Sequence, residues 1–192
     1  MIPPLVLASR SPRRRELLVA AGAKDVKIAA SDVEESSDAS QGLAALVLNN
    51  ARAKATDIAA QFPKSIVLGA DTLVWLDGAA LGKPSDMGEA RHMLDHLSGR
   101  VHEVCTGVHL VRLDPHLQVE FHETTHVRFR PLDAAAIDAY LQRVDVLDKA
   151  GAYALQEHGD LIIESVEGSR SNVVGLPVER TLAALRRFSL QA

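Results

Sequence analysis

Cationic residues gather where an apolar strand is predicted to turn into a helix, in the run LVLASRSPRRRELL. Ser11 suits the N-cap of that helix and Pro12 its first position, where the missing N–H costs nothing. The residues that then fill the first turn are Arg13, Arg14 and Arg15. Exposed N–H groups and the helix dipole favour anions there, so cations are unfavourable unless a negative ligand is bound. Two interpretations follow: a phosphate cradle of N–H groups, serine hydroxyls and guanidinium groups, or a solvated basic face paired with Glu16.

A lysine interrupts the apolar face of the helix predicted for Gly42–Phe62. At helical spacing that face consists of Leu43, Leu46, Val47, Asn50, Ala51, Lys54, Ile58 and Phe62. Because burying an unpaired ammonium is costly, Lys54 either extends its head to solvent, which is the commoner outcome, or meets an anion.

An aspartate closes the apolar strand predicted for Ser65–Asp71. A carboxylate at the carboxyl end of a strand, two residues after Gly69, stands where open sheets place ligand chemistry. The alternative is a turn aspartate that caps its own backbone. Lys83 lies in the loop LGKPSD, which is not a P-loop because the GxxxxGK[ST] pattern is absent.

Length and charge bound what these residues can do. The chain has 192 residues, enough for one domain or two closely joined lobes with a substantial core. Its net charge of −4 argues against a polyanion binder, and the arginine cluster is followed by an acidic stretch around Glu35. Basic and acidic side chains close together suit a site for a phosphate and its metal ion better than a surface that binds a DNA backbone.

The single cysteine, Cys105, excludes an intrachain disulfide and a multi-cysteine zinc site, and it suits a reducing compartment. The sequence has no evident signal segment and no apolar run near the ~20 residues of a membrane span. We therefore expect a cytoplasmic protein with no membrane association.

Turn and capping residues divide the rest of the chain into elements. The expected helices begin at Pro12 and span Gly42–Phe62, Ser85–Leu97, Asp133–Arg143 and Leu176–Phe188. The expected strands are Leu5–Ala8, Ser65–Asp71 continuing to Leu76, Val101–Leu113, Val119–Phe129 and Asp160–Val166. Asp77-Gly78 predicts a hairpin turn, Asp86 with Glu89 predicts a capped helix start, and Ser31–Gly42 is a polar connection. Alternating helices and strands interrupted by a hairpin favour an α/β fold with α+β features and a mixed sheet.

The histidine pairs are weak candidates for chemistry. His92 and His96 lack a third metal ligand and are expected on a solvated helix face, and His122 and His126 on a solvated hairpin. Cys105 is expected in the core, and no Ser-His-Asp or Cys-His signature is present.

Seven motifs in register resemble the Maf family of nucleoside triphosphate pyrophosphatases, from Leu5 to the final helix. They are LASRSPRRRELL, VEE, ARAKA, LGADTLV, LGKPSD, KAGAYALQ and EGSRSNVVGLP. The resemblance implies one Maf-like domain over residues 1–192, with an elongated mixed sheet flanked by helices, two lobes around a central cleft, and a homodimer. It implies hydrolysis of a nucleoside triphosphate to the monophosphate and pyrophosphate with Mg²⁺ or Mn²⁺. AYALQ and SNVVGLP are similar to the branch that acts on dTTP and UTP rather than the one selective for 7-methyl-GTP.

The resemblance also implies roles for residues at matching positions. Asp71 matches the proton acceptor, and the positions that govern base selectivity are Arg13, Thr72 and Gln156. The phosphate and metal shell matches Ser9, Arg13, Arg14, Glu35, Lys54 and Lys83. We hypothesise that Glu35 and Asp71 hold the divalent ion and that Lys83 and Arg13 stabilise the departing pyrophosphate. The Gln156 amide is a donor and an acceptor, which complements a uracil or thymine edge.

Three residues depart from the family pattern: Arg10 and Glu157 stand where glycine is usual, and Arg170 where an aromatic residue is usual. Alternatives of other classes are a nucleotide-binding regulator, since the family has been associated with septum formation, and a nucleic-acid binder using the SPRRR cluster. A further alternative is an enzyme of the same fold acting on purine triphosphates such as ITP.

Overall fold

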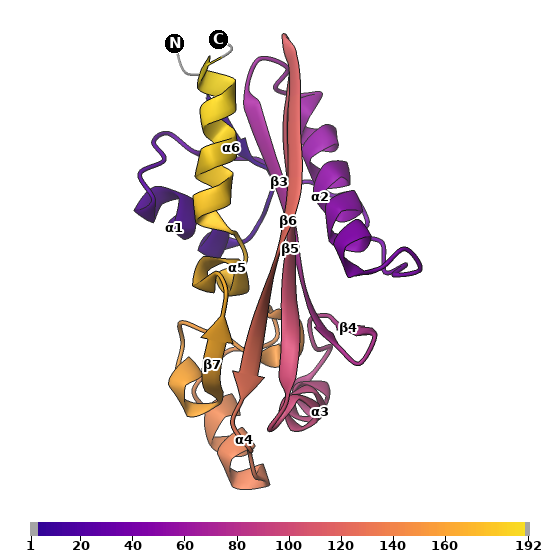
Figure 1. The fold of residues 1–192 in the computed structure, drawn as a ribbon, viewed down its shortest axis with the longest axis vertical. Helices are drawn as coiled ribbons and strands as arrows, with labels where there is room; N and C mark the ends of the chain where they lie inside the picture. Colours follow the sequence, from indigo (N-terminus) through magenta and orange to yellow (C-terminus); the bar gives the residue numbers. More distant parts are fainter. Residues whose placement is uncertain (1–3, 191–192) are drawn as a thin grey trace. The chain divides into compact units, whose positions relative to one another are not determined.

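The computed structural model describes residues 4–190, which form a seven-stranded mixed sheet with helices packed on it (Figure 1). Backbone contacts divide the chain into two compact units. The first takes the residues up to Asp71, Thr106–Glu123 and the residues from Gly175 onward. The second takes Thr72–Cys105 and Thr124–Val174. The expected α/β class with a mixed sheet is confirmed.

The sheet runs in the order β2-β1-β3-β5-β6-β7, with β4 paired to β3. The strands are β1 (Leu5–Leu7), β2 (Lys27–Ile28), β3 (Ile66–Leu76), β4 (Ala79–Leu81), β5 (Val101–Leu113), β6 (His116–Phe129) and β7 (Ile163–Glu167). β1 pairs in parallel with β2 and β3, whereas β4 pairs antiparallel with β3 and β7 antiparallel with β6. The parallel part of the sheet therefore lies in the first unit, where the arginine-rich helix follows β1.

Helices cover both faces of the sheet in the first unit. These helices are α1 (Pro12–Ala20), α2 (Leu43–Ala59) and α6 (Val178–Leu190). Alternate residues of β1 point to opposite faces: Leu7 packs with α1 and α6, and Val6 packs with α2 (Figure 1). This first unit thus has a core on each side of its sheet.

The second unit has a core of its own around Phe129 and Tyr140. Its helices are α3 (Met87–Leu97), α4 (Ala134–Leu141) and α5 (Arg170–Val174), with short 3₁₀ turns at Ala150–Ala152 and Gly159–Leu161. Within residues 4–190, no helix combines the length and apolar character needed to cross a bilayer.

Local chemistry forms several elements as expected. Asp86 accepts a hydrogen bond from the Glu89 N–H at the start of α3 (2.8 Å), and Glu89 accepts one from the Ser85 N–H. Asp77 and Gly78 have φ of 52° and 83°, and join β3 to β4 as the predicted hairpin. The reciprocal cap and the turn are both confirmed.

Several boundaries differ from the expectation. α2 ends at Ala59 rather than Phe62, because Gln61 and Phe62 donate to carbonyls three residues back and tighten the end into a turn. The expected final helix, Leu176–Phe188, is α6 with shifted ends, and the short helix α5 before it was not expected. Gly175 separates α5 from α6 with a φ of 129° that no helix accommodates. Three more bounds differ. β6 begins at His116 rather than Val119, and α4 ends at Leu141 rather than Arg143. A 3₁₀ turn at Gly159–Leu161 precedes β7, which begins at Ile163 rather than Asp160.

Candidate active site

A buried serine follows the carboxyl end of β1 and organises the start of α1. The Ser9 Oγ accepts hydrogen bonds from the Ser11 N–H and from Arg14 Nη1, both at 3.2 Å. Ser11 is at the N-cap position and Pro12 opens the helix, but Ser11 makes no side-chain cap bond. The cap expected of Ser11 is therefore wrong. The reason is that the backbone N–H of Ser11 turns toward Ser9, which takes the organising role instead.

Arg14 is fixed in place at this loop. Its Nε donates to the Gly175 carbonyl (2.8 Å) and its Nη1 to Ser9. Burial lowers the pKa of the Arg14 guanidinium below its ordinary value, whereas the nearby carboxylates of Asp71 and Glu35 raise it. Arg13 lies half-buried in the same turn, and its like charge also lowers the Arg14 pKa. The first turn of α1 thus places cations and carboxylates within electrostatic reach of one another.

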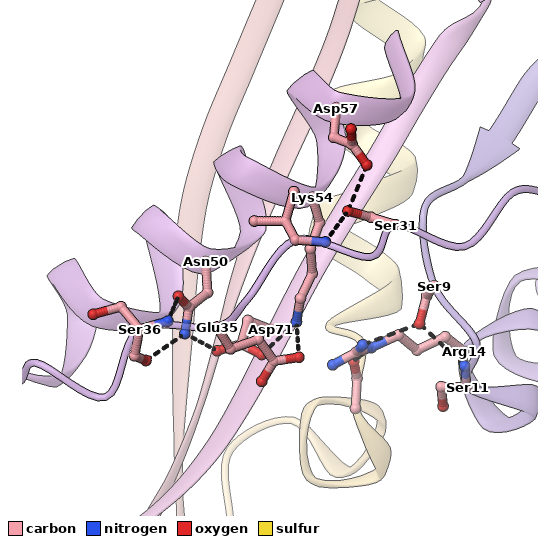
Figure 2. Close-up of polar contacts among 12 residues, drawn as sticks. Ser9, Ser11, Arg14, Ser31, Glu35, Ser36, Asn50, Lys54, Asp57 and Asp71 are labelled. Carbon is pink, nitrogen blue, oxygen red and sulfur yellow. Dashed lines mark hydrogen bonds and ion pairs between the residues drawn. The ribbon is translucent and has the colours of Figure 1, made fainter. Parts of the chain in front are cut away.

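Lys54 is buried and lies between two carboxylates (Figure 2). Its Nζ is 2.8 Å from Asp71 Oδ1 and 2.7 Å from Glu35 Oε1. Of the two outcomes considered for Lys54, the commoner one, in which the side chain extends to solvent, is therefore wrong. The ammonium meets anions instead, because an acidic residue of the polar connection and one of β3 converge on it.

The extended run expected to continue to Leu76 is confirmed, and it belongs to β3. Asp71 therefore lies inside the strand, and its expected place at a strand end is wrong. The run after it remains apolar and pairs with β4, which extends the strand. Parallel pairing with β1 reaches Leu68, so Asp71 lies three residues beyond the carboxyl end of that pairing. Its Oδ1 accepts from Lys54 and its Oδ2 from the Asn50 amide (3.0 Å). These contacts come from α2, which rules out the self-capping turn.

Glycine brings α2 close enough to make these contacts. A Cβ on Gly69 would lie 2.2 Å from the Ala51 carbonyl oxygen, and one on Gly107 would lie 2.4 Å from the Val47 carbonyl oxygen. The helix therefore rests on the backbone of β3 and β5, where no side chain fits between. Asn50 and Lys54 are one turn apart and both point from α2 to Asp71 (Figure 2).

Asn50 is a further polar residue of the site, and none of the sequence motifs assigns it a role. It is buried, and besides Asp71 it binds both backbone groups of Ser36. An amide inside an apolar stripe is the signal that could have identified it, because a buried amide needs polar partners.

The carboxylates of Glu35 and Asp71 fit a hard divalent cation. Both approach one ammonium, so their oxygens converge on a single cationic position. Mg²⁺ is commonly held by one or two carboxylates together with water and phosphate oxygens, so a third protein ligand is not required. Among residues 4–190, no group of three or more His, Cys, Asp or Glu side chains is arranged so that it could hold a metal ion.

The other predicted residues lie in the second unit. Thr72 is half-buried, and Lys83 and Gln156 are exposed. The Gly151 N–H donates to the Gly82 carbonyl (2.9 Å), which ties the KAGAYALQ segment to the loop that carries Lys83.

A buried lysine anchors the residue after Gln156. Lys149 Nζ is 2.8 Å from Asp148 Oδ1 and 3.4 Å from Glu157 Oε1. Glu157, one of the departures from the family pattern, therefore forms an ion pair within its own segment. Of the other departures, Arg10 pairs with Asp32 on the surface of the first unit.

The remaining expectations concern weak candidates. Arg170, the third departure, begins α5 and is exposed. The solvated positions expected for the histidines are confirmed, since the side chains involved are all exposed: His92, His96, His122 and His126. Cys105 is buried in the core, as expected.

Comparison with known proteins gives a consistent result. The family model described as Maf-like protein matches residues 4–188. A dTTP/UTP pyrophosphatase of Akkermansia muciniphila is 48% identical over 192 residues, covering 100% of both chains. One of Symbiobacterium thermophilum is 47% identical, covering 96% of this chain and 93% of the relative. One of Bacillus cereus is 42% identical, covering 97% of this chain and 90% of the relative. With nearly its whole length matched, the chain belongs to the Maf-like protein family.

Proposed function

We propose that this protein hydrolyses nucleoside triphosphates, with dTTP and UTP preferred, to the nucleoside monophosphate and pyrophosphate. The observation that carries the proposal is the cluster of Asp71, Lys54 and Glu35, within electrostatic reach of the arginine-bearing start of α1. This arrangement brings carboxylates that can bind a metal ion near cationic groups that can bind phosphates. The names of the relatives, which match over nearly the whole chain, support the same reaction.

Phosphate binding falls to Ser9, Arg13, Arg14 and Lys54. The guanidinium groups stand at a helix start, where backbone N–H groups also favour anions. Arg14 is held by Ser9 and the Gly175 carbonyl, so little side-chain entropy is lost when a phosphate binds. Lys83 of the second unit stabilises the negative charge on the departing pyrophosphate, together with Arg13.

Glu35 and Asp71 would hold the divalent ion, Mg²⁺ or Mn²⁺, which when bound neutralises phosphate charge and makes bound water more acidic. In the proposed step, water attacks the α phosphorus, and the bond from that phosphorus to the bridging oxygen of the β phosphate breaks. Asp71 orients the water and accepts its proton, and the bridging oxygen leaves with pyrophosphate. The buried carboxylate suits this role because Lys54 and Asn50 fix both of its oxygens.

Base selection is assigned to Arg13, Thr72 and Gln156. The exposed Gln156 amide has one donor and one acceptor face, as a uracil or thymine edge requires. The same family resemblance supports a homodimer, and the presence of only one cysteine in the sequence supports a cytoplasmic location.

The alternative of a regulator without turnover is not favoured, because the relatives are named for an enzymatic reaction. Nucleic-acid binding through the SPRRR cluster has no support either. Arg14 donates to Ser9 and to the Gly175 carbonyl, and Arg10 pairs with Asp32.

The test is a panel of nucleoside triphosphates, with ITP and 7-methyl-GTP included, assayed with Mg²⁺ for pyrophosphate release. Metal-dependent release with dTTP and UTP ahead of the others is expected. Asp71→Asn should abolish release yet leave nucleotide binding measurable, whereas the exposed Asp57→Asn control should remain active. Near-normal turnover by Asp71→Asn would overturn the assignment of the proton acceptor.

A further inference from the structure

Asn50 links the two carboxylates of the site, which come from segments far apart in the chain. Its Nδ2 donates to Asp71 Oδ2 (3.0 Å) and to the Ser36 carbonyl (3.1 Å). Its Oδ1 accepts from the Ser36 N–H (2.9 Å). One side chain of α2 thus holds a carboxylate of β3 and, through Ser36, the backbone next to Glu35 (Figure 2).

These three bonds determine how the amide is oriented. The oxygen faces a donor and the nitrogen faces two acceptors, so a flipped amide would set its oxygen against two acceptors and lose all three bonds. The residue is 4% exposed, so water cannot easily replace the lost partners. Asn50 therefore has one satisfied orientation.

The position of Asn50 is set by the backbone contact beneath it. Gly69 allows the backbone of α2 at Ala51 to lie against β3, which places the neighbouring Asn50 beside the strand that carries Asp71. The segment that carries Glu35 has no regular secondary structure, and the Glu35 side chain is 56% exposed. The clamp on Ser36 thus restrains a segment that no helix or strand of its own restrains.

We propose that Asn50 is a positioning residue that sets both carboxylates of the site at once. It orients Asp71 through its amide N–H and holds Glu35 beside Lys54 through both backbone groups of Ser36. This inference rests on the proposed function, in which Asp71 and Glu35 hold the divalent ion. Asn50 itself contacts neither substrate nor metal in this account.

The test compares Asn50→Leu with Asn49→Leu, an exposed neighbour on the same helix. Two quantities are measured in the full-length protein: hydrogen exchange of the Ser36 amide without nucleotide or metal, and kcat and KM for dTTP at saturating Mg²⁺. Asn50→Leu should expose the Ser36 amide to exchange at least tenfold faster. Its kcat should fall ten- to a hundredfold, which corresponds to the loss of a hydrogen bond to a charged group, while KM changes less. The Asn49→Leu control should change neither.

A double-mutant cycle separates positioning from general loss of stability. If Asn50 acts partly by placing Glu35, Glu35→Gln should cost less activity in the Asn50→Leu background than in the wild type. Fully additive effects, or a Ser36 amide that stays protected in Asn50→Leu, would overturn the proposal.

A second variant covers the case in which Asn50→Leu does not fold. Asn50→Asp keeps the shape and the acceptor for the Ser36 N–H, but it places an oxygen where Asp71 Oδ2 and the Ser36 carbonyl each receive an N–H. It should retain Ser36 protection and still lose kcat, and an unchanged kcat would overturn the orientation of Asp71 by Asn50. If the wild type releases no pyrophosphate, the proposed function fails, whereas the exchange measurement still decides whether the clamp exists.

Discussion

Lys54 and Asp71 form a buried ion pair between α2 and β3, with 2.8 Å from Nζ to Oδ1 and side chains only 11% and 5% exposed. Glu35 approaches the same ammonium at 2.7 Å. Two carboxylates therefore share one cation, and together the three residues carry an excess negative charge of one. Such a group attracts a further cation, and the energetic role of Lys54 follows from that imbalance.

Replacing Lys54 with methionine should make stability depend on the metal. Without the ammonium, two adjacent carboxylates lose their counter-charge, and breaking a buried pair in this way costs about 3 kcal/mol. Unfolding by denaturant should show that loss, and Mg²⁺ should stabilise Lys54→Met more than it stabilises the wild type. The exposed Lys64→Met is the control. An Mg²⁺ effect equal in Lys54→Met and wild type would contradict the account.

Arg13 is predicted to bind the triphosphate. Arg13→Ala should raise the KM for dTTP by about tenfold or more, the usual effect of losing a charge-assisted hydrogen bond. Arg15→Ala, at an exposed position of the same turn, should leave KM near the wild-type value. An unchanged KM in Arg13→Ala would contradict this role and favour the alternative interpretation, in which the arginines form a solvated basic face.

The close approach of α2 to β3 should make Gly69 intolerant of a side chain. Because a Cβ there would meet the backbone of α2, Gly69→Ala should lower the free energy of unfolding by at least about 2 kcal/mol. Gly82→Ala is the control, since a Cβ at that position has open space. Equal midpoints of denaturation for the two variants would show that the helix does not rest on Gly69.

A buried histidine in the second unit predicts a loss of stability in acid. His102 Nε2 lies 2.8 Å from the Tyr153 hydroxyl, and burial lowers the pKa of His102 from 6.5 to about 4. As pH falls, His102 therefore becomes protonated in the unfolded chain at a higher pH than in the folded protein. Stability from His102 is complete above pH 6.5 and is lost as pH falls toward 4, by about 3 kcal/mol.

The measurement is the free energy of unfolding against pH for wild type, His102→Gln and the exposed His92→Gln. The slope between pH 6.5 and 4 should be smaller in His102→Gln, which has no titrating group at that position, and unchanged in His92→Gln. Parallel curves for wild type and His102→Gln would refute the burial effect.

Local chemistry made much of the fold predictable. The cap at Asp86, the turn at Asp77-Gly78 and the helix start at Pro12 each depend on neighbours within about four residues, which the sequence displays directly. The end of α2 and the short helix α5 were missed, because a tightened last turn and a helix of five residues leave no clear periodic signal.

The site was predictable in its members but not in its contacts. Whether Lys54 reaches solvent or an anion depends on Glu35, 19 positions earlier, and on Asp71, 17 positions later. Neither the stripe of α2 nor the strand pattern contains that relationship. Asn50 was overlooked for the same reason, since its partners come from two other segments.

The central claim, that water attacks the α phosphorus of dTTP or UTP, is tested most directly by hydrolysis of dTTP in H₂¹⁸O with Mg²⁺. Mass spectrometry of both products locates the labelled oxygen. Attack at the α phosphorus places ¹⁸O in dTMP and leaves pyrophosphate unlabelled, which is the predicted result. Label in pyrophosphate, or products consisting of dTDP and labelled phosphate, would contradict the account.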